Sequence, residues 1–202
     1  MANPNKPCGF VPVQYLSGAA WNGQARLYSI DKDYATALYI GDPVKSSGTS
    51  DANGVQGVVL GAATGALRGV IVGLGTTEGL IANPSNLDII YRPAAATAKD
   101  WFAMVVDDPQ VLFELQEKAG TQQLAAADIG LNTVPVIAAG NGFSSGWTLA
   151  SYTDATPATT ATLQLRLMGL VRRFNNAFVA YAKHLVKINV HELGTGTGAA
   201  GV

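Results

Sequence analysis

One stretch near the C-terminus, residues 162–192, constrains the fold more than any other. Its two ends alternate apolar with polar or flexible side chains, and the apolar members are Leu163, Leu165, Leu167, Val186, Ile188 and Val190. A period of two is the signature of a β-strand with one buried face. Asn175 and Asn176 lie between the ends, and asparagine tolerates the backbone of tight turns. The pattern therefore predicts two long antiparallel strands joined near Asn175.

The same stretch also carries a helical pattern. Apolar side chains recur there at spacings of three and four, namely Leu167, Leu170, Val171, Phe174, Phe178, Tyr181 and Leu185. Such spacing would form one face of a helix. Gly169, the adjacent asparagines and the β-branched end of the stretch disfavour a helix. We favour strands and leave the helix open for residues 167–185.

Glycine content and turn spacing indicate the fold class. The chain has 202 residues with 23 glycines, and short apolar runs alternate with Gly-rich turns. This pattern is typical of all-β proteins. We predict an all-β fold with a small Gly-rich, β-barrel-like portion over residues 24–92. A jelly-roll-like sandwich or barrel should follow over residues 101–193, after a small polar linker at 93–100.

The glycines between residues 57 and 75 suggest close packing of strands rather than a phosphate site. They recur every two to four residues. No GxxxxGK[ST] sequence is present, and no GxGxxG introduces an acceptable helix, so a nucleotide site is disfavoured. Glycine in a strand commonly marks a sharp bend or a close approach of neighbouring backbones. We expect these glycines to allow sharp bends and close approach of strands in a small barrel.

Both ends of the chain are expected to lie outside the two β units. Residues 1–23 should form an extended arm, because Pro4, Pro7 and Pro12 block a helix and remove ladder donors. The arm is rich in large apolar side chains, so it should pack either on its own domain or on a neighbouring molecule. In the second case the contact residues would be Phe10, Val13, Tyr15, Leu16 and Trp21. Residues 194–202 have nothing to bury and are predicted to be mobile.

Charge and composition disfavour several partners. The formal net charge is −1, so no basic excess exists to neutralise phosphates, and we expect no direct nucleic-acid partner. No run of about 20 apolar residues is present, so we expect no membrane span. The first ten residues lack the apolar core of a signal peptide. The single cysteine, Cys8, excludes an internal disulfide and indicates synthesis in a reducing compartment.

The sequence shows no catalytic constellation. His184 and His191 lie seven apart and would face opposite sides of a strand, so they should not pair on a metal. His191 shares its side with Lys187, and we expect that face to be solvated. Adjacent acidic residues at 107–108 precede a proline, which we interpret as turn chemistry rather than a metal site. We predict no enzymatic activity, no cofactor and no metal.

Three stretches resemble the capsid cement (head decoration) proteins of tailed bacteriophages. They are the series RLYSI…YATALYIGDPVKSSG…GVQGVVLGAA…LRGVIVG, the segment VVDDPQVLFELQ followed by DIGLN, and FNNAFVAYAKHLVKINVHE. The resemblance implies a virion protein made in the host bacterial cytoplasm. It implies binding to the mature icosahedral head, where the protein would bridge major capsid subunits against internal DNA pressure. A homotrimer is preferred to a dimer, because icosahedral shells offer many local three-fold positions.

Two other function classes remain open. One is a β-rich phage tail or receptor-binding module that recognises carbohydrate through Trp101, Trp147 or Tyr152. Exposed aromatic rings would support it, whereas buried rings would favour a cement protein. The other is a small hydrolase, which would need a pocket that brings distant Asp, Glu and His side chains together. For Trp101 and Trp147 we prefer a role in core packing.

Overall fold

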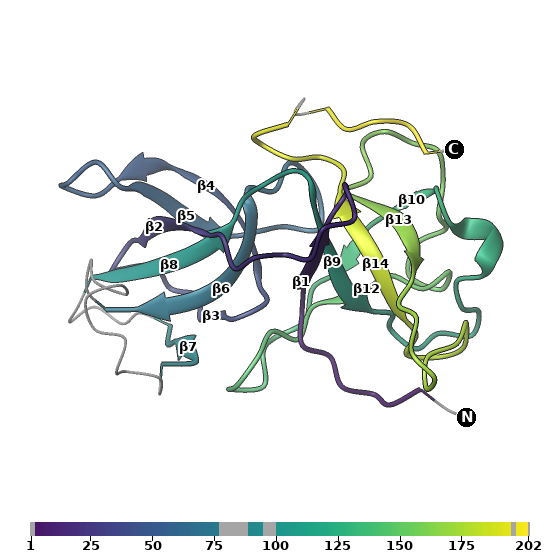
Figure 1. Ribbon diagram of the computed structural model, residues 1–202. Helices are drawn as coiled ribbons and strands as arrows, with labels where there is room; N and C mark the ends of the chain where they lie inside the picture. Colours follow the sequence, from purple (N-terminus) through teal and green to yellow (C-terminus); the bar gives the residue numbers. More distant parts are fainter. Residues whose placement is uncertain (1–2, 77–88, 95–99, 195–196, 202) are drawn as a thin grey trace.

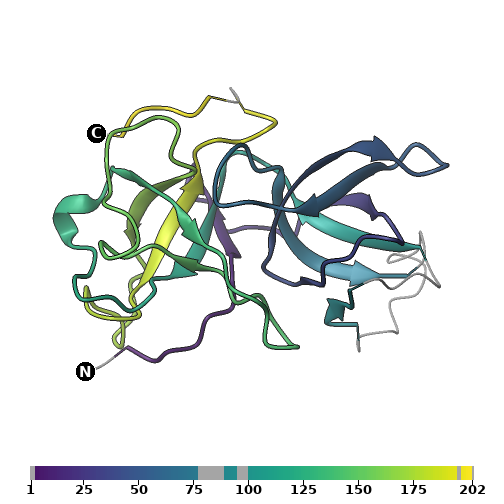
Figure 2. The same ribbon diagram turned by 180° about the vertical axis from the view of Figure 1, so that it is seen from behind.

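The structure is a computed structural model that describes residues 3–76, 89–94, 100–194 and 197–201. The prediction of an all-β fold is confirmed, because strands dominate and the described residues contain one short 3-10 turn, η1 (Ala126–Asp128). Two β units lie side by side in Figures 1 and 2. Both marked chain ends lie on the second unit, at the side away from the first.

The first unit is a closed five-stranded barrel with the strand order β2-β5-β4-β6-β8. Its strands are β2 (Arg26–Ile30), β4 (Pro43–Ser50), β5 (Gln56–Leu60), β6 (Gly69–Gly75) and β8 (Trp101–Val106). The pairings are antiparallel except that of β2 with β5. A small ribbon of β3 (Leu38–Tyr39) and β7 (Tyr91–Arg92) accompanies it, with stacked tyrosine rings across the pair.

Two features of the barrel differ from the sequence prediction. Strand β8 was grouped with the C-terminal half, but it closes the barrel by pairing with β2 on one side and β6 on the other. The sequence pattern predicts a turn over residues 46–54, but residues 46–50 belong to β4 and only residues 51–55 lie between β4 and β5. The polar composition of β4 shows no apolar alternation from which a strand could be predicted. Its extended backbone depends on pairing with neighbouring strands rather than on its own side chains. The linker expected at 93–100 lies largely outside the described residues.

The second unit is a five-stranded antiparallel sheet with the order β1-β9-β14-β13-β10. Its strands are β1 (Val11–Tyr15), β9 (Val111–Gln116), β10 (Asn132–Thr133), β13 (Leu165–Leu170) and β14 (Lys183–Ile188). A two-stranded ribbon of β11 (Pro135–Val136) and β12 (Thr148–Leu149) adds Leu149 to the core beneath the sheet. Phe113 and Trp147 are buried in the same core.

The hairpin of β13 and β14 confirms the strand interpretation of residues 162–192. The strands pair antiparallel, and Leu167 and Val186 face each other on the buried side. Asn176 joins the strand ends through its side chain rather than through a left-handed backbone. Its amide nitrogen donates to Val171 O and Lys183 O at 2.8 Å each, and its oxygen accepts from Lys183 N at 2.9 Å.

The described residues near both ends of the chain contact the second unit. The arm packs on its own domain, which is one of the two expected alternatives, whereas the expectation of a mobile tail is wrong for residues 197–201. Val11–Tyr15 is an edge strand paired with β9, so the arm over residues 1–23 packs on its own chain. Asn3 donates to Ala177 O at 2.9 Å and so ties the N-terminus to the β13–β14 connection. Residues 197–201 lie back against the second unit, where Gly201 N donates to Thr159 O. Hydrogen bonds of polar backbone groups therefore fix this tail, although it buries no large apolar side chain.

The glycine prediction is confirmed where two barrel strands meet. A Cβ atom on Gly69 would lie 2.2 Å from Val106 O and 2.9 Å from the Asp107 Cα. Both contacts are with backbone, which cannot give way as a flexible side chain can. A Cβ atom on Gly73, in the same strand, would meet only the Met104 side chain at 3.5 Å, which is ordinary van der Waals contact.

We therefore expect Gly69→Ala to destabilise the protein by roughly 2–4 kcal/mol, because overpacking against backbone forces the barrel wall apart. Gly73→Ala is the matched control and should change stability by less than about 1 kcal/mol. Chemical denaturation of both variants measures the difference. Equal stabilities would contradict the close approach at Gly69.

Candidate functional site

The expected contact residues of the N-terminal arm divide into buried and exposed sets. Phe10 is only 1% exposed and packs edge-on against Phe113, with ring centroids 6.0 Å apart. Its proposed role as an intermolecular contact is therefore wrong, because the ring fills the core of its own sheet. Tyr15 and Trp21 are half-buried against the same core. Val13 and Leu16 remain exposed, together with Val11.

The face of the sheet opposite the core carries a charge cluster centred on Glu114. Val11, Glu114 and Leu185 lie directly across from one another on β1, β9 and β14, so they share this face. The Glu114 carboxylate is nearly buried and accepts hydrogen bonds from Arg173 through both of its oxygens, at 3.1 and 2.7 Å. Lys183 donates to it at 3.0 Å. One carboxylate is thus held between two cations.

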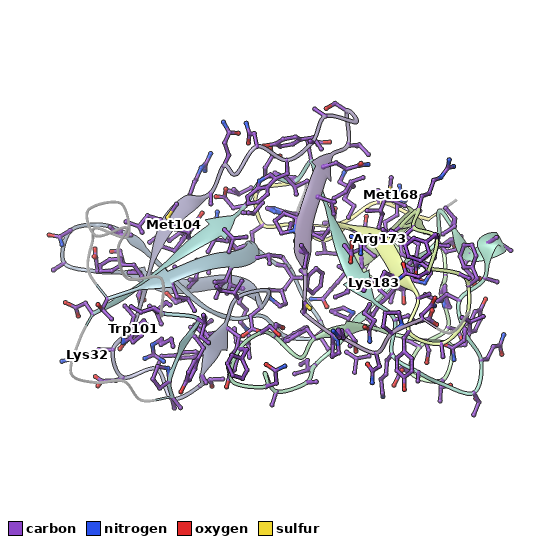
Figure 3. The ribbon with its side chains drawn as sticks, turned by 60° about the horizontal axis from the view of Figure 1, so that its bottom comes forward. Lys32, Trp101, Met104, Met168, Arg173 and Lys183 are labelled. Carbon is purple, nitrogen blue, oxygen red and sulfur yellow. The ribbon has the colours of Figure 1, made fainter. Side chains whose placement is uncertain are left out.

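Figure 3 shows Arg173 and Lys183 close together over this sheet. Two more cations flank them. Arg172 precedes Arg173 and is exposed. Lys6 is exposed as well, and its backbone N–H donates to the side chain of Gln116, which lies opposite Lys183 in the strand register. We call Lys6, Arg172, Arg173, Lys183, Glu114, Val11, Leu185, Phe174 and Val179 the basic patch.

Phe174 is the most exposed large apolar side chain in the described part of the chain, at 93%. It lies in the β13–β14 connection, directly after the arginine pair. Sequence reasoning placed Phe174 in a helical stripe or a strand and did not identify it as a surface residue. The sequence signal was available, because Arg172, Arg173 and Phe174 directly precede the asparagines of a predicted turn, where side chains face solvent.

A second polar cluster is buried at the junction between the two β units, and it is structural. Residues 61–68 of the barrel meet residues 190–192 there. Arg68 Nε lies 2.8 Å from Glu192 Oε2, and Ser46 N donates to the other carboxylate oxygen at 2.9 Å. Leu67 pairs with His191 in a parallel bridge. This cluster was not found from sequence, because its members are far apart along the chain.

Three groups near the junction have displaced pKa values, each mainly because of burial. Burial lowers the pKa of His191 from 6.5 to about 4, and its Nδ1 accepts from Leu193 N. Burial raises the pKa of Asp42 from 3.8 to about 6. Burial and the hydrogen bond to Asp107 raise the pKa of Tyr28 from 10.0 to about 12. The expectation of a solvated His191 is therefore wrong.

The second histidine is also buried. His184 Nε2 lies 3.2 Å from Glu117 Oε2, and both side chains are fully shielded from solvent. Glu117 also accepts a hydrogen bond from Leu124 N at 2.8 Å. A carboxylate and an imidazole in contact can act in general acid–base catalysis. Here no substrate could reach either group, so the pair fixes the end of β9 to β14 in the core.

Two cavities lie elsewhere on the molecule. One, of about 750 Å³, lies at the end of the barrel and is lined mainly by polar residues with Trp101 at its wall. The other, of about 650 Å³, lies by Arg26, Asp107 and Tyr15. The described lining residues of both cavities include neither histidine nor glutamate. They do not form the Asp, Glu and His pocket that a hydrolase would need.

Of the aromatic residues named for carbohydrate recognition, the two tryptophans are buried and Tyr152 is half-buried. Trp147 lies in the core, and Trp101 is 8% exposed. The Tyr152 hydroxyl donates to Asp128 Oδ1, and its ring packs against the core cluster. Within the described ranges, no three or more His, Cys, Asp or Glu side chains gather in a way that could hold a metal ion. No helix there has the length and apolar character of a membrane span.

Comparison of the chain with protein-family models found no match, and comparisons with curated proteins and with solved structures found none either.

The burial of His191 makes the stability of the protein sensitive to acid. Its folded-state pKa of about 4 lies below the usual 6.5, so the unfolded chain takes up the proton first as the pH falls. Acidification from pH 7 to pH 4 should therefore cost the wild-type protein about 2–3 kcal/mol more than it costs the variant His191→Asn. Asparagine retains an acceptor for Leu193 N but does not titrate.

Denaturant unfolding of both proteins at pH 7 and pH 4 measures this difference. Asp42 acts in the opposite direction, because its raised pKa favours the folded state on acidification, but it is present in both proteins and cancels in the comparison. Parallel pH profiles for the two proteins would contradict a buried, neutral His191.

Proposed function

We propose that this chain is a structural cement protein of a tailed-phage capsid. In this role it binds the outer surface of the mature icosahedral head and bridges major capsid protein subunits. The observation that carries the proposal is which side chains are buried and which are exposed. The histidines are buried in structural contacts, whereas large apolar side chains project from one edge strand and several loops. Where such groups gather, as Val11, Val13 and Leu16 do on and beside β1, they suit a protein–protein contact.

The distribution of these apolar groups suits a bridging protein. Val11, Val13 and Leu16 lie on or beside the edge strand β1, whereas Phe174 and Val179 lie in the β13–β14 connection. Phe143, at 73% exposed, lies in a third place, the loop before β12. Separate contact points on one body allow it to touch more than one neighbour. Modest contacts then sum through a high effective concentration on a repeated lattice.

The connection between the two β units also suits such a role. The backbone and ion-pair contacts of residues 61–68 with residues 190–192 join them through buried groups. A protein that binds the expanded lattice and not the compact one stabilises the expanded form by mass action. A body whose parts do not hinge freely transmits load between its contact points. A homotrimer at local three-fold positions is part of the proposal.

The alternative of a carbohydrate-binding tail module gains no support from the aromatic residues. Stacking on a sugar requires an accessible ring face, and the Trp101 and Trp147 rings are buried. The cement proposal uses instead the side chains that are exposed.

Copy number in purified virions tests the proposal. Quantitative mass spectrometry of purified particles of the phage that encodes this chain should give one copy per major capsid subunit, or a simple fraction of it. A lattice-wide protein must follow the stoichiometry of the lattice. A few copies per particle would contradict the cement role and favour a tail component, and absence from the particle would contradict both.

A further inference from the structure

The basic patch has a local charge that the whole chain does not share. The chain carries 13 basic and 14 acidic residues. Within the patch, Arg173 and Lys183 bind the single carboxylate of Glu114, Arg172 precedes Arg173 in the chain, and the backbone of Lys6 is bonded to the side chain of Gln116 on the same strand as Glu114. Lys118 lies beyond the end of β9, but Asp154 neutralises it at 2.6 Å. The patch therefore retains an excess of about three positive charges on one end of the sheet.

Apolar side chains stand within this positive field. Phe174 and Val179 project from the same connection, and Val11 lies beside Glu114 on the neighbouring strand. Arg173 is 48% exposed although it binds Glu114, so part of its guanidinium faces solvent. Aromatic residues and arginine are the types enriched where binding energy concentrates at protein interfaces. Lys6 and Arg172 have no ion-pair partner among the described residues.

The connection that presents Phe174 is held in place rather than loose. Asn176 makes three hydrogen bonds across its base, and Asn3 donates to the backbone oxygens of Ala177, Val179 and Ala180. The two-oxygen contact of Arg173 with Glu114 pins its start to the sheet. A side chain presented in a fixed position loses less conformational entropy when it binds. The fold thus fixes the backbone of the connection that exposes Phe174.

We propose that the basic patch is the surface that docks on the head shell, and that its occupant is an acidic protein surface of the shell with an apolar recess for Phe174. This inference rests on the proposed cement function. Carboxylates of the shell would lie against Arg172 and Lys6, and the Phe174 ring would enter the recess. The positive charge speeds encounter and fixes orientation, whereas the aromatic ring supplies most of the affinity.

Binding of the purified full-length chain to expanded, nuclease-treated phage heads that lack it tests this inference. Phe174→Ser and Arg172→Glu should each weaken binding by roughly tenfold or more. Two matched controls carry similar chemical changes elsewhere. Ile137→Ser removes another exposed apolar side chain, and Lys45→Glu reverses an exposed charge on β4 of the barrel. Both controls should bind within about twofold of the wild-type chain.

Salt adds a second readout. Wild-type affinity should fall with rising ionic strength, and Arg172→Glu should flatten that dependence while Phe174→Ser leaves its slope unchanged. All four substitutions lie at exposed positions, so thermal melting should show that each variant is folded.

The outcomes separate this inference from the function on which it rests. If the wild-type chain binds heads and the patch variants bind as well as the controls, the docking surface lies elsewhere and the cement function stands. If the wild-type chain fails to bind heads both before and after nuclease treatment, both proposals fall. If the patch substitutions abolish self-association in sedimentation while head binding persists, the occupant is a second copy and the inference is wrong. Binding to untreated heads that is lost after nuclease treatment would identify nucleic acid as the occupant and would also overturn the inference.

Discussion

The buried ion pair of Arg68 with Glu192 is the contact on which the arrangement of the molecule depends. It lies where the barrel and the five-stranded sheet meet, and both side chains are largely shielded from water. Such a pair must be well satisfied, because desolvation of two charges costs several kcal/mol per ion. Its neighbours satisfy it in part, because Arg68 Nε and Glu192 Oε2 have each other as ion-pair partners but no hydrogen-bond partner among the described residues. The Glu192 carboxylate also accepts from Ser46 N of the barrel, and Glu192 N donates to Leu67 O.

The same junction is reinforced by backbone and amide contacts. Leu67 N donates to Val190 O, and the Gln164 side chain donates to Ala62 O and Gly65 O at 3.0 and 2.7 Å. A barrel loop is therefore bound along the end of the β13–β14 hairpin much as a strand would be. Removal of one partner would leave a buried charge or amide unpaired, so the contacts enforce one relative placement of the two units. The surface groups proposed to contact the shell consequently keep fixed positions relative to one another.

The distribution of charge follows from this architecture. Several charged side chains at the junction and in the core are paired, as with Arg68 beside Glu192 and Glu117 beside His184, whereas the buried Arg92 donates to backbone oxygens. On the outer side of the sheet one carboxylate, Glu114, meets more cations than it can neutralise. Surplus charge with a projecting phenylalanine stabilises no part of the fold. The proposed docking surface therefore lies on the basic patch rather than at a cavity.

Local patterns in the sequence determined the all-β class, the hairpin of residues 162–192 and the close-packing role of Gly69. Each depends on side-chain alternation or on backbone freedom within a few residues. Tertiary structure alone decided that Phe10 fills the core, that β8 closes the barrel and that His191 is buried. These outcomes depend on contacts between residues that lie from 27 (Gly75 and Phe102) to 124 (Leu67 and His191) positions apart in the chain. Strand pairing follows from competition among many possible neighbours. The basic patch belongs to the same class, because β-sheet register and the Glu114 contacts bring Lys6 and Val11 beside the arginines of the hairpin.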